Sequence, residues 1–154
     1  MKILHIAEPQ TFTKSFFQLV EKEFEHTQHC ILSHASAEEW PKNLNIKSKN
    51  LTGAAWFLSF TRAAHQADKI IIHGLWDFYA IVLLFLQPWV LKKCYWMIWG
   101  GDLYDYKFGC KSWKWWLRNY FKRPVIKRMG HLITYVEGDV EFARNWYGAT
   151  GKYH

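Results

Sequence analysis

Titratable side chains stand beside glycines at three points where a predicted strand ends. These points are His73-Gly74, Gly100-Gly101-Asp102 and Glu137-Gly138-Asp139. Glycine has no Cβ and lets a ligand approach the backbone closely, and a neighbouring imidazole or carboxylate can accept or donate a proton. The sequence therefore predicts proton-transfer chemistry at these strand ends, with Asp102 and His73 as the candidate catalytic residues.

Each strand end also has a structural interpretation. Gly and Asp are ordinary turn residues, so Gly100-Gly101-Asp102 also fits a tight turn whose Asp caps the next element. Asp139 is a natural N-cap for a final helix, and His73 can be satisfied by backbone contacts. The joint occurrence of three such ends favours a site over three unrelated turns.

Alternating strands and helices are expected to position these residues. Strands are predicted at 2–7, 29–33, 69–74, 94–99 and 131–136, with a weak one near 45–51. Helices are predicted at 12–24 with Thr11 as the N-cap, at 53–67 with Thr52 as the N-cap, at 75–91 and at 140–147. A further helix is predicted from residue 111, and Pro124 is expected to break it. This pattern favours the α/β class, a Rossmann-like parallel sheet with helices on both faces, formed by residues 1–154 as a single domain. In such sheets ligands bind beyond the carboxyl ends of the strands.

The basic residues of the chain are concentrated in one segment. Of the 154 residues, eight basic and no acidic ones lie between Lys107 and Arg128, while the other twelve basic and thirteen acidic residues nearly cancel. Such a patch indicates an anionic partner, either a membrane surface, a phosphorylated substrate or nucleic acid. The three cysteines have no metal-ligand spacing and cannot all pair, which favours a reducing, cytoplasmic location. The N-terminus does not resemble a signal peptide.

A helix in this basic segment would separate aromatic from basic side chains. At about 100° per residue, one side carries Trp113, Trp116, Leu117, Tyr120 and Phe121, and the other carries Lys111, Lys114, Arg118 and Lys122 with Trp115 beside them. One interpretation is a helix that lies in a membrane interface. The other is a surface helix whose Trp113 and Trp116 dock into the core while its lysines are solvated. Trp115 on the basic side favours the membrane.

Several other classes of site have no motif in the sequence. The glycine-rich fingerprints that bind dinucleotide and nucleotide phosphates are missing, and no recognised nucleic-acid motif accompanies the basic patch. No cluster of His, Cys, Asp or Glu has metal-ligand spacing. The apolar run around 79–86 is shorter than the roughly 20 residues that a spanning helix needs. We therefore expect neither a metal nor a nucleic-acid partner.

The order of these features resembles one family of enzymes. His73-Gly74 and a Trp-rich helix precede residues 96–104, WMIWGGDLY, and a basic helix and a Glu-Gly-Asp turn follow. This arrangement is similar to the bacterial TDP-N-acetylfucosamine:lipid II N-acetylfucosaminyltransferases, also named 4-alpha-L-fucosyltransferases, of enterobacterial common antigen synthesis. The resemblance covers most of the chain and is most specific at residues 98–104.

The resemblance implies a glycosyltransferase of the GT-B type, with two Rossmann-like domains. This chain is then expected to be the N-terminal, acceptor-binding domain, inactive alone, with the donor-binding domain outside it. The implied donor is a nucleotide-sugar, in this family a TDP-sugar, and the implied acceptor is a polyprenyl-pyrophosphate-linked glycan. A peripheral location on the inner membrane and the absence of any cofactor follow from the same resemblance.

The implied mechanism assigns roles to the candidate residues. Asp102 would take the proton from the acceptor hydroxyl, and His73 would orient the acceptor or share the proton. The implied acceptor-binding residues are Gly100, Gly101, Tyr104, Glu137 and Asp139. The implied contacts to membrane and phosphate are Lys111, Lys114, Arg118, Lys122, Trp113 and Trp116. The alternative is a Rossmann-like module without chemistry that binds a membrane or a partner protein.

Overall fold

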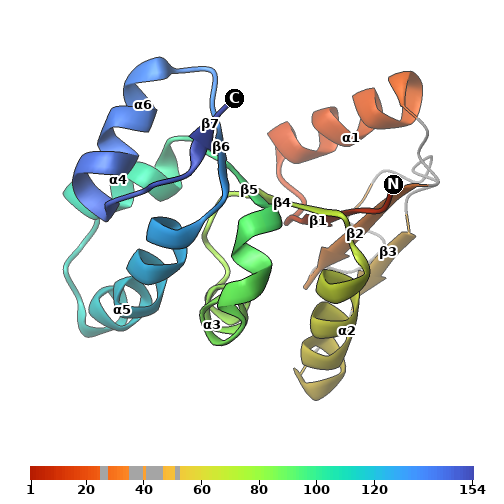
Figure 1. Ribbon diagram of the computed structural model, residues 1–154, viewed down its shortest axis with the longest axis horizontal. Helices are drawn as coiled ribbons and strands as arrows, with labels where there is room; N and C mark the ends of the chain where they lie inside the picture. The colour runs from red at the N-terminus through yellow and green to blue at the C-terminus, as the bar shows by residue number, and fades with distance from the viewer. Residues whose placement is uncertain (25–27, 35–39, 41–46, 51–52) are drawn as a thin grey trace. The chain divides into compact units, whose positions relative to one another are not determined.

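The computed structural model describes residues 1–24, 28–34, 40, 47–50 and 53–154. These residues form two compact units, Met1–His73 and Gly74–His154. In both units the strands are parallel and helices connect them (Figure 1). The predicted α/β class, with its Rossmann-like arrangement of parallel strands and helices, is confirmed.

The first unit is a four-stranded parallel sheet in the order β3-β2-β1-β4. Its elements are β1 (Ile3–Ile6), α1 (Thr11–Glu23), β2 (His29–Ser33), β3 (Lys47–Asn50), α2 (Gly53–Gln66) and β4 (Lys69–His73). The two helices lie on opposite faces of the strands (Figure 1). In α1, Phe17 and Val20 pack with Ile31 and Trp40, and α2 buries Trp56, Phe60 and Ala64 at intervals of one helical turn.

The second unit contains a three-stranded parallel sheet in the order β5-β6-β7. Its elements are α3 (Phe78–Leu86), the 3-10 helix η3 (Pro88–Lys93), β5 (Cys94–Met97), α4 (Gly101–Phe108), α5 (Trp113–Arg128), β6 (His131–Ile133), α6 (Glu137–Phe142), the π-helix η4 (Ala143–Tyr147) and β7 (Lys152–Tyr153). Helix α3 packs beside α5 (Figure 1). Strand β7 was not expected from the sequence, because two residues carry no periodic pattern.

Several helix ends differ from the predictions, each for a local reason. The helix predicted at 75–91 is only Phe78–Leu86, because Asp77 caps it through the N–H of Tyr79 and a residue that precedes proline, here Gln87, avoids helical backbone angles. Thr11 is the first residue of α1 and not its cap, since Gln10 holds that position. The predicted cap Thr52 lies outside the described residues.

Helix α5 runs through Pro124 without a break, contrary to the prediction. Proline removes one backbone donor and disturbs the preceding turn. The missing bond falls at the carbonyl of Tyr120, whose side chain is on the exposed side of the helix. Val125 and Ile126, which follow the proline directly, are fully buried and hold the last turns against the unit.

Candidate active site

The Gly-Gly-Asp segment follows β5, as the sequence predicts, and it begins α4, a helix that was not predicted. Gly100 is the N-cap of α4 and has φ 90° and ψ −58°, angles that a residue with a Cβ rarely adopts. The carbonyl of Gly100 accepts the first helical hydrogen bond from Tyr104 N at 2.8 Å. Gly100 therefore makes the sharp turn, and Gly101 and Asp102 lie in the first turn of the helix.

Asp102 is fully buried and joins three segments of the second unit. Its Oδ2 accepts hydrogen bonds from Leu75 N at 2.9 Å and from Trp96 Nε1 at 2.6 Å. Its Oδ1 is buried without a hydrogen-bond partner among the described residues. The carboxylate thus fixes the turn after Gly74, strand β5 and helix α4 together. It is not the N-cap that the structural interpretation predicted.

Trp76 fills the space that the sequence assigned to a ligand over the glycines. A Cβ on Gly101 would lie 3.0 Å from Cζ2 of its indole, and a Cβ on Gly74 would lie 3.1 Å from Cδ1. Larger residues at either position would push the ring away. The indole is 41% exposed, so a partly exposed aromatic side chain covers the turn beside Asp102.

Lys122 is a buried partner of this site that the sequence placed on the basic, solvated side of a helix. It is 0% exposed, and its Nζ donates to the carbonyl of Asp102 at 2.6 Å. Its ammonium also lies 5.9 Å from the ring centroid of Trp76 and 5.4 Å from that of Tyr147. Burial lowers its pKa to about 8, while the charges of Asp102 and Asp105 act in the opposite direction.

The depressed pKa of Lys122 predicts a pH-dependent stability. Between pH 8 and the ordinary lysine value of 10.5, the unfolded chain binds this proton and the folded chain does not, so the free energy of unfolding rises with pH in that window. Relative to Lys122→Met, the wild-type protein should gain on the order of 3 kcal/mol from pH 7 to pH 10.5. Urea unfolding at several pH values measures this. The control variant Lys114→Met changes an exposed lysine, so its stability should follow that of the wild-type protein over this pH range. An equal pH-dependent difference from the wild type in both variants would contradict the prediction.

A second carboxylate, Asp139, binds the phenol of Tyr104. The Tyr104 hydroxyl donates to Asp139 Oδ1 at 2.8 Å, and Thr134 Oγ1 donates to Oδ2 at 3.4 Å. The hydrogen bond to Asp139 raises the pKa of Tyr104, and burial and the charge of Asp139 add to this. Asp139 is buried within α6 rather than at its N-cap, a position that Val136 holds. Glu137 is exposed at the start of the same helix.

The second unit thus brings Asp102 and Lys122 into one cluster and Tyr104 and Asp139 into another. Arg118 pairs with Asp105 at 2.5 Å, and its guanidinium lies 5.8 Å from the ring centroid of Trp76, beside the first cluster. His73 belongs to the first unit, where it is 6% exposed.

The two faces of α5 are reversed relative to the docking interpretation. Trp113 and Trp116 are 70% and 63% exposed, whereas Trp115 is buried. The buried face consists of Trp115, Asn119, Lys122, Val125 and Ile126. The prediction that Lys122 and Trp115 lie on a solvated side is therefore wrong, because their long side chains fill the space against α4 and the turn at Trp76. Lys111 and Lys114 are exposed as predicted.

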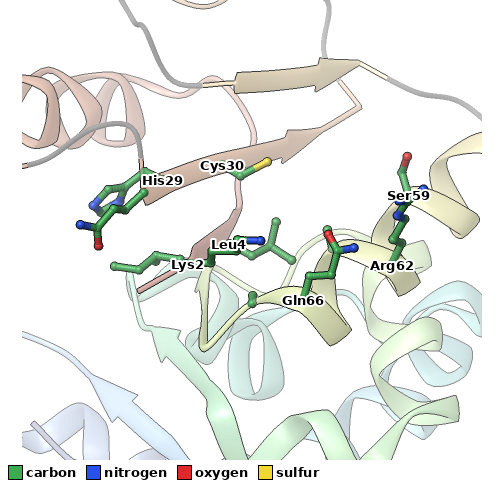
Figure 2. Close-up of a pocket in the computed structure, with 11 residues that line it drawn as sticks. Lys2, Leu4, His29, Cys30, Ser59, Arg62 and Gln66 are labelled. Atoms are coloured by element: carbon green, nitrogen blue, oxygen red, sulfur yellow. The ribbon is translucent and has the colours of Figure 1, made fainter.

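A pocket of about 490 Å³ lies elsewhere, in the first unit (Figure 2). Leu4 and Cys30 line it from β1 and β2, and Ser59, Arg62 and Gln66 line it from α2. Its strand residues stand at the amino-terminal ends of β1 and β2, whereas α/β sheets bind ligands at the carboxyl ends. We therefore place the candidate active site at the Gly-Gly-Asp turn and not in this pocket.

Two further properties concern metals and membranes. In the described parts of the chain, no group of three or more His, Cys, Asp or Glu side chains is arranged to hold a metal ion. Within those same residues, no helix has the length and apolar character needed to cross a membrane.

The turn geometry predicts that a methyl group at Gly100 is strained. Gly100→Ala should lower the free energy of unfolding by about 1–3 kcal/mol, the cost of a sparsely populated backbone conformation. Gly138→Ala is the matched control, since a Cβ there meets nothing within 4 Å inside a helix. Chemical denaturation should show the control unchanged or more stable. Equal stability of the two variants would contradict the assigned role.

These features define the class of the protein: an α/β protein with Rossmann-like parallel strands and a Gly-Gly-Asp turn at a strand end. A family model described as 4-alpha-L-fucosyltransferase, glycosyl transferase group 56, matches residues 9–152. The chain belongs to this family of glycosyltransferases, which transfer a sugar from a nucleotide-sugar donor to a glycan acceptor. Searches of curated proteins and of solved structures gave no match.

Proposed function

We propose that this glycosyltransferase transfers a fucosyl or N-acetylfucosaminyl group from a TDP-sugar to a polyprenyl-pyrophosphate-linked glycan. The reaction would serve the synthesis of a bacterial surface polysaccharide such as enterobacterial common antigen. In this proposal the chain supplies the acceptor side of a GT-B enzyme and works as a peripheral protein on the anionic, cytoplasmic surface of the inner membrane.

The observation that supports a lipid-linked acceptor is the exposed aromatic surface of α3 and α5. Phe85 of α3 contacts the rings of Tyr120 and Phe121, at centroid distances of 6.5 and 5.1 Å, so the two helices form one continuous surface. Its exposed large side chains are Tyr79, Leu86, Trp113, Trp116, Leu117 and Tyr120. An exposed apolar patch of this kind marks an interaction site.

Helix α5 also carries exposed cations. Lys114, Lys127 and Arg128 of α5 are exposed, and α5 carries no acidic residue. Tryptophan and tyrosine favour the level of lipid headgroups, and lysine and arginine are attracted to anionic phosphates. The combination favours a membrane surface over a protein core as the partner of α5. It also supports an acceptor that is presented at that surface.

The roles proposed for the site residues follow from their surroundings. Two donors hold Oδ2 of Asp102, and Oδ1 remains an acceptor. We propose that Oδ1 takes the proton of the acceptor hydroxyl once Trp76 has moved from the turn. Tyr104 and Asp139 form a hydrogen-bonded pair that is proposed, with Gly100 and Gly101, to bind the acceptor.

Two more residues have proposed roles outside this turn. His73 is proposed to orient the acceptor or to share its proton. The exposed carboxylate of Glu137 is proposed as a further acceptor contact.

A transfer assay with the intact enzyme tests the proposal. TDP-N-acetylfucosamine and a lipid-linked glycan should give an extended lipid-linked product, and the same sugar on UDP or GDP should give much less. A folded enzyme that forms product only from another class of donor, or from none, would contradict the proposed function. A binding module without chemistry would give no product with any donor.

A further inference from the structure

Three aromatic side chains of the second unit form a continuous stack. The ring of Phe142 in α6 lies parallel to that of Trp146 in η4, with 4.6 Å between centroids and 8° between planes. Trp146 in turn stacks on Tyr106 of α4, with 5.9 Å between centroids and 17° between planes. We call Phe142, Trp146 and Tyr106 the ring stack. Its helices α4 and α6 follow strands β5 and β6 (Figure 1), and α/β proteins bind ligands where such helices begin.

The inner end of the ring stack is fixed by its neighbours. Tyr106 lies 5.1 Å from Tyr147 and 6.3 Å from Trp115 between ring centroids, and both of these neighbours are buried. Arg123 of α5 donates a hydrogen bond to the carbonyl of Trp146 at 3.3 Å, and its guanidinium lies 5.6 Å from the ring centroid of Tyr106. The middle ring of the stack is therefore held in place.

The outer end of the ring stack is open to solvent. Phe142 is 38% exposed, although Trp146 covers one face of its ring. Tyr104 approaches the same ring steeply, with 6.1 Å between centroids and 63° between planes. The exposed part of the Phe142 ring is therefore the face that points away from Trp146. An apolar face that is held in place beforehand loses little conformational entropy when a ligand binds.

Hydrogen-bond acceptors accompany this open face. The Tyr104 hydroxyl donates to Asp139 and keeps lone pairs that can accept a hydrogen bond. Glu137 and Glu141 of α6 are exposed, and α6 contains no basic residue. The surroundings of the open face thus offer a phenol oxygen and carboxylates to a ligand that carries hydroxyl groups.

These features favour a sugar over a membrane as the ligand of the open face. A pyranose ring presents C–H groups on its faces, which pack on the electron-rich face of an aromatic ring. Its rim carries hydroxyl groups, which donate to carboxylate and phenol oxygens. The negative charge of α6 is unfavourable at an anionic membrane surface, in contrast to the cations of α5.

We propose that Phe142 is a stacking platform for one pyranose ring of the acceptor glycan, with Tyr104 and the exposed carboxylates of α6 as hydrogen-bond acceptors. The proposal rests on the proposed function, in which Tyr104, Asp139 and Glu137 bind the acceptor. Tyr104 follows Asp102 by two residues in α4, so the platform adjoins the helix that carries the proposed base. Such a contact binds the acceptor equally in the ground state and in the transition state, and it therefore lowers KM without raising kcat.

Substitutions of Phe142 separate stacking from apolar contact. Phe142→Leu keeps an apolar side chain but removes the flat face, and it should raise the KM for the acceptor by about 10-fold, equivalent to about 1.4 kcal/mol, with kcat nearly unchanged. Phe142→Tyr keeps the ring and should keep the wild-type KM. Phe57→Leu, which changes a phenylalanine of α2 that is 45% exposed, is the matched control and should leave KM unchanged.

NMR of the folded protein with ¹³C-labelled phenylalanine rings detects the sugar directly. The probes are methyl β-D-glucopyranoside and the glycan that mild acid releases from the lipid-linked acceptor. We expect at least one of them to shift the ring signals of Phe142, which are assigned from the spectrum of Phe142→Leu, and to leave those of Phe57 in place.

Phe142 signals that neither probe moves, or a wild-type KM in the Phe142→Leu enzyme, would overturn the platform. Loss of binding to anionic vesicles in Phe142→Leu at an unchanged KM would assign this face to the membrane and would also overturn it. A shift with methyl β-D-glucopyranoside in a folded enzyme without transfer activity would support the platform and contradict the proposed function.

Discussion

Asp102→Ala is expected to lower the free energy of unfolding by about 2–6 kcal/mol, because it leaves two buried donors without an acceptor, at about 1–3 kcal/mol each. The donors are the N–H of Leu75 and the indole N–H of Trp96, which meet at Oδ2. The measurement is denaturant unfolding followed by tryptophan fluorescence. Glu137→Ala, which removes an exposed carboxylate from α6, is the control and should cost little.

Asp102→Asn separates the structural from the catalytic contribution of this residue. The asparagine oxygen can still accept from Leu75 and Trp96, so the protein should remain folded with a smaller loss of stability. If Oδ1 takes the acceptor proton, kcat in the intact enzyme should fall by about 10²–10⁴-fold, with little change in KM. Near-normal kcat in a folded Asp102→Asn enzyme would show that Asp102 only holds the turn together.

Neutralising the exposed cations of α5 is expected to release the protein from anionic vesicles. Each lysine or arginine near an anionic surface contributes about 1 kcal/mol. The triple change Lys114→Gln, Lys127→Gln and Arg128→Gln should therefore weaken binding by roughly 10²-fold, and added salt should reduce the difference. Co-sedimentation with vesicles that contain anionic lipid measures it.

The control for this prediction removes the same charge elsewhere. Lys2, Lys22 and Lys152 are exposed lysines outside α5, and changing all three to Gln gives the same net charge as the α5 variant. Equal loss in both variants would indicate attraction by net charge alone. Unchanged co-sedimentation of the α5 variant would contradict the membrane role of this helix.

The sequence predicts strands β4 and β5 well because each is a compact apolar run. The β-branched run at Lys69–His73 and the aromatic run at Cys94–Met97 both form the expected parallel strands. The Gly-Gly-Asp motif correctly locates a turn with a positive φ at Gly100. Local composition determines these features, so they can be read from the chain alone.

The face of α5 that is buried could not be predicted from the sequence. A helical wheel separates Trp113 and Trp116 from Trp115 and Lys122 but does not say which side meets the rest of the unit. The choice depends on Asp102, whose carbonyl receives the Lys122 ammonium, and on Asp105, whose carbonyl receives the Trp115 indole at 3.0 Å. Such long-range partners have no signature in a single sequence.

The hydrogen bonds that join His5 to His29 and to His73 were missed for a similar reason. His73 stands out at the end of a predicted strand, but His5 and His29 are single polar residues in two other strands. Only the register of β2, β1 and β4 places the three rings on one diagonal. Once the register is known, the spacing of these positions along the parallel strands indicates that their side chains share one face of the sheet.

We propose that this glycosyltransferase acts on a lipid-linked acceptor at an anionic membrane surface. The most direct measurement compares kcat/KM of the intact enzyme for one glycan in two forms, attached to a polyprenyl pyrophosphate in anionic vesicles and free in solution. We expect the lipid-linked form to be preferred by about 10²-fold, equivalent to roughly 3 kcal/mol of membrane and pyrophosphate contacts. Equal kcat/KM for the two forms would contradict the claim.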